Sequence, residues 1–123
     1  MSSDSRRALG NEGETRAAEH LAARGYRIVA RNVRADRVEI DLVVERGGTL
    51  AFVEVKTRAS TRHGAPALAV DARKQRRILR GAGAWMRTQR VRPRRIRFDV
   101  VSCWRADDGS WRIDHWPGAF DGS

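Results

Sequence analysis

Two β-like runs on either side of Gly47-Gly48 constrain the fold of this chain more than any other feature. Residues 38–46 and 49–57 are rich in branched apolar side chains, and a Gly-Gly dipeptide suits a tight hairpin turn. A two-residue turn fixes the register of the hairpin and places Asp41 opposite Glu54. The sequence therefore predicts a hairpin in which two carboxylates face each other across neighbouring strands.

The two faces of this hairpin differ in chemistry. Because side chains alternate along a strand, Glu39 and Lys56 join Asp41 and Glu54 on one face, with Glu39 opposite Lys56. We expect the other face to be a core face, because nearly all of its side chains are apolar. These side chains are Val38, Ile40, Leu42, Val44, Ala51, Val53, Val55 and Thr57.

Opposed carboxylates predict a site for a divalent cation. Their Cβ atoms lie only about 5 Å apart across a hairpin, and two like charges at that distance repel each other. Mg²⁺ relieves the repulsion, since it accepts one or two protein carboxylates together with water and substrate phosphate. Asp41, Glu54 and the backbone carbonyl of Val55 are the predicted ligands, and Mn²⁺ could take the same oxygens.

Lys56 lies on the same strand face as Glu54, where it could orient or deprotonate an attacking water or stabilise charge on a phosphoryl group. Lysine is scarce in this chain, since only Lys56 and Lys74 occur among its 25 basic residues. The alternative is a solvated sheet face on which Glu39 pairs with Lys56 and Asp41 meets an arginine.

The rest of the chain predicts one mixed α/β domain over residues 11–116, with the element order α-β-β-β-α-β-β. Asn11 is a candidate cap for a helix that stops at Gly25, and this helix turns Glu14 toward the core side. Asp71 is a candidate cap for a helix that runs to about residue 89. Strands are expected at about 26–33, 96–104 and 111–116, a flexible tail at 1–10 and a C-terminal tail at 117–123.

Positive charge is concentrated in one part of the sequence. Residues 58–97 hold thirteen basic residues and one acid, whereas the remaining chain holds twelve basic and fourteen acidic residues. A basic segment beside an acidic one indicates a face that binds a polyanion such as nucleic acid. The alternative is an arginine-rich surface that is only solvated.

Several side chains of this segment are candidates for contacts to phosphate. His63 lies in the loop after the hairpin and Gln75 on the second helix could face the site, although both residues are often inert in such positions. The candidate phosphate contacts are Arg58, Arg62, His63, Arg73, Lys74, Arg76, Arg77 and Arg80.

Composition excludes other classes of protein. The lone Cys103 rules out an internal disulfide framework and favours a buried structural thiol. No apolar run reaches the roughly 18 residues of a membrane span, and the first residues lack the apolar core of a signal peptide. We therefore expect a cytoplasmic protein with no membrane partner.

The chain resembles a known family of bacterial proteins. The resemblance covers about residues 10–103, and EIDL at 39–42 followed by FVEVKTR at 52–58 is its most specific part. Other matching residues are Gly10, Gly13-Glu14, Ala17, Leu21, Gly25-Tyr26, Arg31-Asn32, Arg34, Gly64, Lys74 and RFDVV at 97–101. This pattern is similar to the YraN-like family of the PD-(D/E)xK superfamily, which is distantly similar to archaeal Holliday junction resolvases.

The resemblance implies a restriction-endonuclease-like fold with three layers, in which helices flank a mixed β-sheet. It maps Asp41, Glu54 and Lys56 onto metal-binding and catalytic positions, and Glu14 onto an extra acidic position that could hold a second metal or a water. The expected function is a Mg²⁺-dependent, structure-selective endonuclease that cuts branched DNA and forms a homodimer on a two-fold symmetric junction. Two alternatives stay open: a binding module of the same fold that assists recombination, repair or DNA uptake without cutting, and a domain that handles RNA.

Overall fold

The protein forms a five-stranded sheet with one helix on each face. The computed structural model describes residues 3–59 and 70–121. Its elements are α1 (Ser3–Ala23), β1 (Arg27–Ala35), β2 (Val38–Arg46), β3 (Thr49–Arg58), α2 (Ala72–Gln89), β4 (Arg95–Arg105) and β5 (Trp111–Phe120). This is the predicted order of helices and strands.

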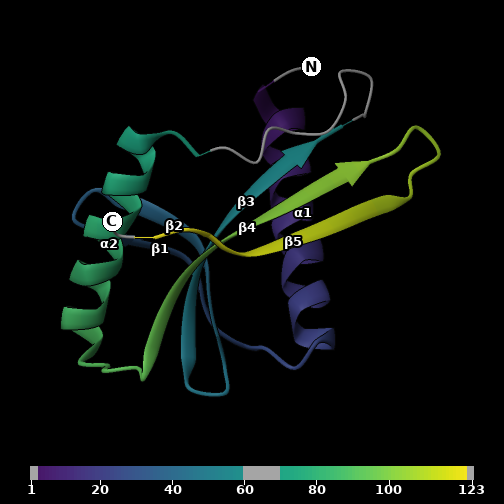
Figure 1. Ribbon diagram of the computed structural model, residues 1–123. Helices are drawn as coiled ribbons and strands as arrows, with labels where there is room; N and C mark the ends of the chain where they lie inside the picture. Colours follow the sequence, from purple (N-terminus) through teal and green to yellow (C-terminus); the bar gives the residue numbers. More distant parts are fainter. Residues whose placement is uncertain (1–2, 60–69, 122–123) are drawn as a thin grey trace.

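The strands lie in sequence order in one mixed sheet. β1, β2 and β3 form an antiparallel meander, β3 pairs with β4 in parallel, and β4 pairs with β5 in antiparallel fashion. The parallel pair requires a crossover, and α2 is part of it. Figure 1 shows the sheet between α2 and α1. The predicted restriction-endonuclease-like arrangement of three layers is confirmed.

The first helix is longer than the sequence indicated. α1 begins at Ser3, so the predicted start at Asn11 was wrong, and most of the expected tail at 1–10 is helical. Asn11 lies inside the helix, where its carbonyl accepts a hydrogen bond from Thr15 Oγ1 at 3.1 Å. The predicted stop is confirmed, since Gly25 has φ +89° and donates its N–H to the Ala22 carbonyl at 3.1 Å.

The second helix begins where its cap predicts. Asp71 Oδ1 accepts a hydrogen bond from the Lys74 backbone N–H at 2.8 Å, and the helix ends before Arg90, which adopts a left-handed conformation.

At the C-terminal end of the chain, β5 continues to Phe120, so residues 117–120 belong to a strand and not to the expected C-terminal tail. Phe120 pairs with Phe98 of β4 beyond a bulge, and within this stretch the Gly118 N–H donates to a carboxylate oxygen of Asp99 at 3.0 Å.

The hairpin register is confirmed over the turn-proximal half of β2 and β3. The pairs run from Arg46 with Thr49 to Leu42 with Val53, and the ladder then ends. Beyond it, β2 pairs only with β1 and β3 pairs only with β4, and Figure 1 shows the two strands diverging. The predicted pairing of Glu39 with Lys56 was therefore wrong, because each residue belongs to a different branch of the sheet.

The core is divided between the two faces of the sheet. One cluster packs under α2, and the other packs under α1. The prediction of a single apolar hairpin face was wrong, because Ile40 lies in the α2 cluster and Leu42 in the α1 cluster. Asp41 stands between these two residues, so the side chains at alternate positions of β2 change face at Asp41. Beyond it both faces are buried, because Val43 packs in the α2 cluster and Val44 in the α1 cluster.

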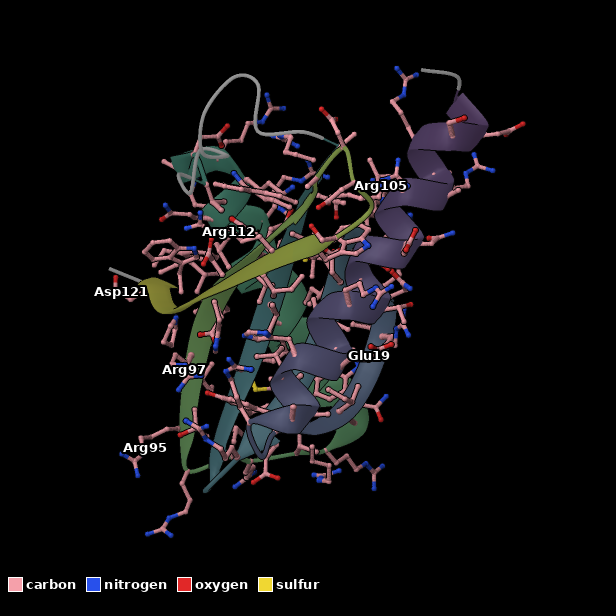
Figure 2. All side chains as sticks on the ribbon, turned by 90° about the vertical axis from the view of Figure 1, so that its right-hand side faces the viewer. Glu19, Arg95, Arg97, Arg105, Arg112 and Asp121 are labelled. Atoms are coloured by element: carbon pink, nitrogen blue, oxygen red, sulfur yellow. The ribbon has the colours of Figure 1, made fainter. Side chains whose placement is uncertain are left out.

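A glycine brings each helix close to the sheet. A Cβ on Gly13 of α1 would lie 2.7 Å from Thr57 Cγ2 on β3, and a Cβ on Gly81 of α2 would lie 2.8 Å from Val38 Cβ on β2. Side chains at these positions would push the helices outward. In Figure 2, α1 lies in front of the sheet and carries the exposed Glu19.

Candidate active site

Asp41 lies where the ladder between β2 and β3 ends. Its Oδ2 accepts a hydrogen bond from the Val55 backbone N–H at 2.8 Å, across the gap that the next pair of the ladder would have closed. Burial and then the negative charge of Glu54 raise the pKa of Asp41 to about 7, against the smaller effect of the Val55 hydrogen bond. Glu54 therefore lies close enough to act on Asp41, but the predicted pair of the two residues is not part of the ladder, which ends at Leu42 and Val53.

Glu54 projects from β3 and is neutralised from α2. Its side chain is largely buried, and its Oε1 forms an ion pair with Lys74 Nζ. Lys74 was predicted as a phosphate contact, and the structure places it at the carboxylate cluster. The parallel pairing of β3 and β4 positions the backbone of Glu54 beside Val100, in the interior of the sheet.

Lys56 lies on the same strand, two residues beyond Glu54. Burial lowers the pKa of Lys56, and the positive charges of Lys74 and Arg58 add to this effect, whereas Glu54 opposes it. A lysine with a lowered pKa exchanges its proton more readily than an exposed one. The side chain can therefore act as an acid or a base beside the carboxylates.

Glu14 approaches the same carboxylates from α1. Burial raises its pKa, and the charges of Glu39 and Glu54 act in the same direction, while the Asn32 side chain opposes them by hydrogen bonding to Glu14. Asn32 has φ +49°, the left-handed region, within β1. A role for Asn32 was not predicted from the sequence, although asparagine is uncommon inside a strand.

The donors at Asp41 and Glu54 fit a hard divalent cation. Both offer carboxylate oxygens, and they repel each other without a cation. Val55 follows Glu54 directly in the sequence, and its N–H contacts Asp41. Among residues 3–59 and 70–121, no group of three Asp, Glu, His or Cys side chains is placed to share one ion. Glu14 therefore does not form a three-carboxylate group with Asp41 and Glu54 in this arrangement.

Comparisons with known proteins place the chain in a family. Residues 13–103 match the model of the uncharacterised protein family UPF0102. The chain belongs to UPF0102. A UPF0102 protein of Trichlorobacter lovleyi is 46% identical over 93% of this chain and 91% of its own length. One of Symbiobacterium thermophilum is 50% identical over 86% of this chain and 90% of its own length, and one of Frankia casuarinae is 47% identical over 92% and 96%.

Apart from Lys74, the predicted phosphate contacts of this UPF0102 chain fall into three groups. Arg73, Arg76 and Arg77 are exposed on α2, and so is Arg58 at the end of β3. Arg80 is also exposed but pairs with Asp36 of the β1–β2 turn at 2.7 Å. Arg62 and His63 lie outside the described residues.

The two supporting residues have structural partners. Glu39 is exposed and pairs with Arg34 of β1 at 3.6 Å, so it remains near Glu14 without entering the Asp41–Glu54 pair. The Gln75 side-chain amide donates to the Val70 carbonyl at 2.7 Å. This hydrogen bond ties the start of α2 to the segment before it and gives Gln75 a structural partner.

A second buried carboxylate lies away from this cluster. Asp99 on β4 is fully buried and accepts hydrogen bonds from both Arg97 Nε and Nη2 at 2.8 Å, and His115 Nε2 lies 2.8 Å from its Oδ2. Figure 2 shows Arg97 on β4, between Arg95 and the crossing β5. Arg97 Nη2 also donates to the Tyr26 hydroxyl at 2.6 Å, so this network ties β5 and the start of β1 to β4.

Two further expectations of the sequence can be compared with the structure. Cys103 is fully buried, which confirms a structural thiol, and burial raises its pKa to about 12. Within the described part of this UPF0102 chain, neither helix has the length and apolar character needed to cross a bilayer.

Proposed function

We propose that this protein is a metal-dependent nuclease that acts on nucleic acids through Asp41, Glu54 and Lys56. The observation that carries the proposal is the break in the β2–β3 ladder. There, a partly buried carboxylate with a raised pKa stands beside a second carboxylate, with a lysine two residues along the strand. Such a combination of crowded acids and a partly buried lysine is typical of sites that do chemistry.

Asp41, Glu54 and the Val55 carbonyl would hold Mg²⁺ or Mn²⁺. When bound, a divalent cation of this kind supplies Lewis-acid polarisation of a phosphoryl oxygen. The Val55 N–H holds the Asp41 carboxylate by a hydrogen bond, and Glu14 of α1, bonded to Asn32 of β1, adds a further acid to the site. Glu14 would hold a water or a second cation.

Lys56 would assist the transfer of a proton. Its lowered pKa suits a side chain that takes a proton from an attacking water or gives one to the leaving oxygen. Its ammonium form would instead stabilise negative charge on the phosphoryl group. Either role needs the compact amine on this face of β3.

The basic segment supports nucleic acid as the substrate. Arg73, Arg76 and Arg77 are exposed on α2, whose first turn places Lys74 beside Glu54, so a bound backbone could extend from the site along α2. Arginine contacts to phosphate bind without reading sequence, which suits a structure-selective enzyme. Branched DNA is the first substrate to test, because of the resemblance to junction resolvases. A homodimer on such a junction and a cytoplasmic location belong to the same proposal.

One observation favours a second candidate function. Lys74 already neutralises Glu54, and no third acidic ligand joins the pair within the described residues. This arrangement supports a module that binds DNA or RNA through α2, acts with recombination, repair or DNA-uptake partners, and does not cut.

The test is a cleavage assay with the full chain. Labelled duplex, single-stranded, flapped and four-way-junction DNA and a structured RNA are incubated with Mg²⁺, Mn²⁺ or EDTA. Asp41→Asn and Lys56→Ala are compared with Glu45→Gln, which removes a carboxylate from the same strand β2 outside the site. Circular dichroism establishes that all variants are folded.

We expect cleavage to require the cation and to persist in Glu45→Gln. In the two site variants the cleavage rate should fall by at least about 100-fold. Binding without cleavage under every condition would reject the nuclease and leave the binding module. A preference for the structured RNA would change the substrate class but not the site.

A further inference from the structure

Lys74 is one of only two lysines in the chain, and both lie at Glu54. Every other basic side chain among the 25 is an arginine. Lys74 forms the ion pair with Glu54, and Lys56 follows Glu54 on the same strand. A lysine holds a carboxylate with a single rotatable ammonium, whereas an arginine holds it with a rigid two-pronged contact. A lysine can therefore leave the carboxylate more readily than an arginine.

The ion pair is unequal in its exposure. The Glu54 side chain is 11% exposed, whereas the Lys74 side chain is 51% exposed. Glu54 is fixed in a central strand of the sheet, between β2 and β4. The ammonium therefore has room to move on its flexible stem, and the carboxylate does not.

The backbone of Lys74 is fixed beside exposed arginines. Its N–H donates to the Asp71 cap, so Lys74 lies in the first turn of α2. Arg73 and Arg77 are exposed on the same helix, so a phosphate backbone drawn to them passes within the reach of Lys74.

We propose that Lys74 is a charge-exchange residue, which neutralises Glu54 in the absence of a divalent cation and turns to a phosphate of the nucleic acid when a cation occupies Glu54. This inference rests on the proposed function. It adds that the cation and the nucleic acid each increase the affinity of the protein for the other through the Lys74 side chain. By thermodynamic linkage, the two affinities increase by the same factor.

The test uses Lys74→Gln, with Arg77→Gln as the matched control one turn further along α2. Mn²⁺ alone is titrated into each full-length protein and followed by calorimetry. Binding of a four-way-junction oligonucleotide is then measured in EDTA and in Ca²⁺. Lys74→Arg is included because it keeps the charge but grips the carboxylate with two bonds.

Without nucleic acid, Lys74→Gln should bind Mn²⁺ roughly three- to tenfold more tightly than the wild type, because the competing ammonium is gone. Lys74→Arg should bind Mn²⁺ no more tightly than the wild type. The factor by which Ca²⁺ tightens junction binding should shrink in Lys74→Gln and stay unchanged in Arg77→Gln, which weakens binding equally with and without Ca²⁺.

Two results would overturn the exchange. One is a Lys74→Gln protein with unchanged or weaker Mn²⁺ affinity, and the other is a full Ca²⁺ enhancement of junction binding in that variant. Failure of the proposed function has a different signature, since a wild-type protein whose Mn²⁺ binding is absent, or unaffected by Asp41→Asn, would remove the cation site itself.

Discussion

Asp99 and Asp41 show how the surroundings of one residue type set its role. Burial alone would raise the pKa of Asp99, but hydrogen bonds from Arg97, His115 and the Gly118 N–H outweigh it and lower that pKa to about 2. Asp41 has one backbone donor and a neighbouring carboxylate, so burial and Glu54 raise its pKa to about 7. Asp99 is therefore satisfied by the protein alone, whereas Asp41 is suited to a positive ligand.

Asp99 should make the free energy of unfolding fall at low pH. Its pKa in the folded protein lies below the ordinary value of 3.8, so its ionised form stabilises the fold at every pH above about 4. This contribution, roughly 2 kcal/mol, is lost as the pH falls from about 4 toward 2. Denaturant unfolding of the wild type at pH 7, 5, 4 and 3, followed by tryptophan fluorescence, measures it.

Asp99→Asn provides the comparison. At pH 7 we expect this variant to lose about 3 kcal/mol of unfolding free energy, because Arg97 keeps its charge without its carboxylate partner. Its free energy of unfolding should then change less between pH 5 and 3 than that of the wild type. Equal pH slopes for the two proteins would contradict the role of Asp99.

At the scale of the element, α1 is placed by its contact with β3. Gly13 lies against the side chain of Thr57, and its carbonyl accepts a hydrogen bond from Cys103 Sγ at 3.4 Å. Glu14 follows directly, so the approach of the helix at Gly13 decides how far Glu14 reaches toward Glu54. The position of one acidic residue thus depends on the absence of a methyl group beside it.

Gly13→Ala should lower the free energy of unfolding by about 1–3 kcal/mol, because the new methyl overlaps Thr57. Gly10→Ala is the control on the same helix. A Cβ at Gly10 meets no atom within 4 Å, so alanine there should stabilise the protein by up to about 1 kcal/mol through helix propensity. Chemical denaturation measures both, and shifts of the same sign would contradict this account of the helix contact.

Helix caps and turns were predicted correctly where they depend only on residues close by in the sequence. The Asp71 cap and the Gly47-Gly48 turn act over three or four residues, and both were predicted correctly. The start of α1 was missed because residues 3–10 have no apolar stripe that marks a helix. The change of face at Asp41 was also missed, since it arises from pairing with β1 and β4, which hairpin periodicity does not contain.

At the scale of the whole molecule, the acidic site and the basic helix lie side by side. The sequence predicted Asp41 beside Glu54 because the two are joined by one hairpin register. It did not predict the contact of Lys74 with Glu54, because a crossover of unknown path separates them. The composition gave the charge of the basic segment, but only the fold shows that α2 brings its first turn to the carboxylates.

The basic helix should make nucleic-acid binding sensitive to salt. Replacing both Arg76 and Arg77 with glutamine should reduce the slope of log Kd against log salt by about two and weaken all sequences alike. The control replaces Arg27 of β1 and Arg112 of β5 with glutamine, which removes the same charge. These two arginines lie away from α2 and pair with Glu45 and Asp114. Fluorescence anisotropy at several salt concentrations measures the slope, and equal losses in the two double variants would contradict a binding face on α2.

The parallel pairing of β3 with β4 has a consequence for the chain during translation. β3 is flanked on one side by β2, which precedes it, and on the other by β4, which is translated only after residues 59–94. At roughly 5–20 residues per second, the ribosome leaves one edge of β3 open for a few seconds. Ala51, Phe52 and Val53, fully buried in the finished protein, lie on that edge. Until β4 pairs with β3, this edge is open to pairing with another chain.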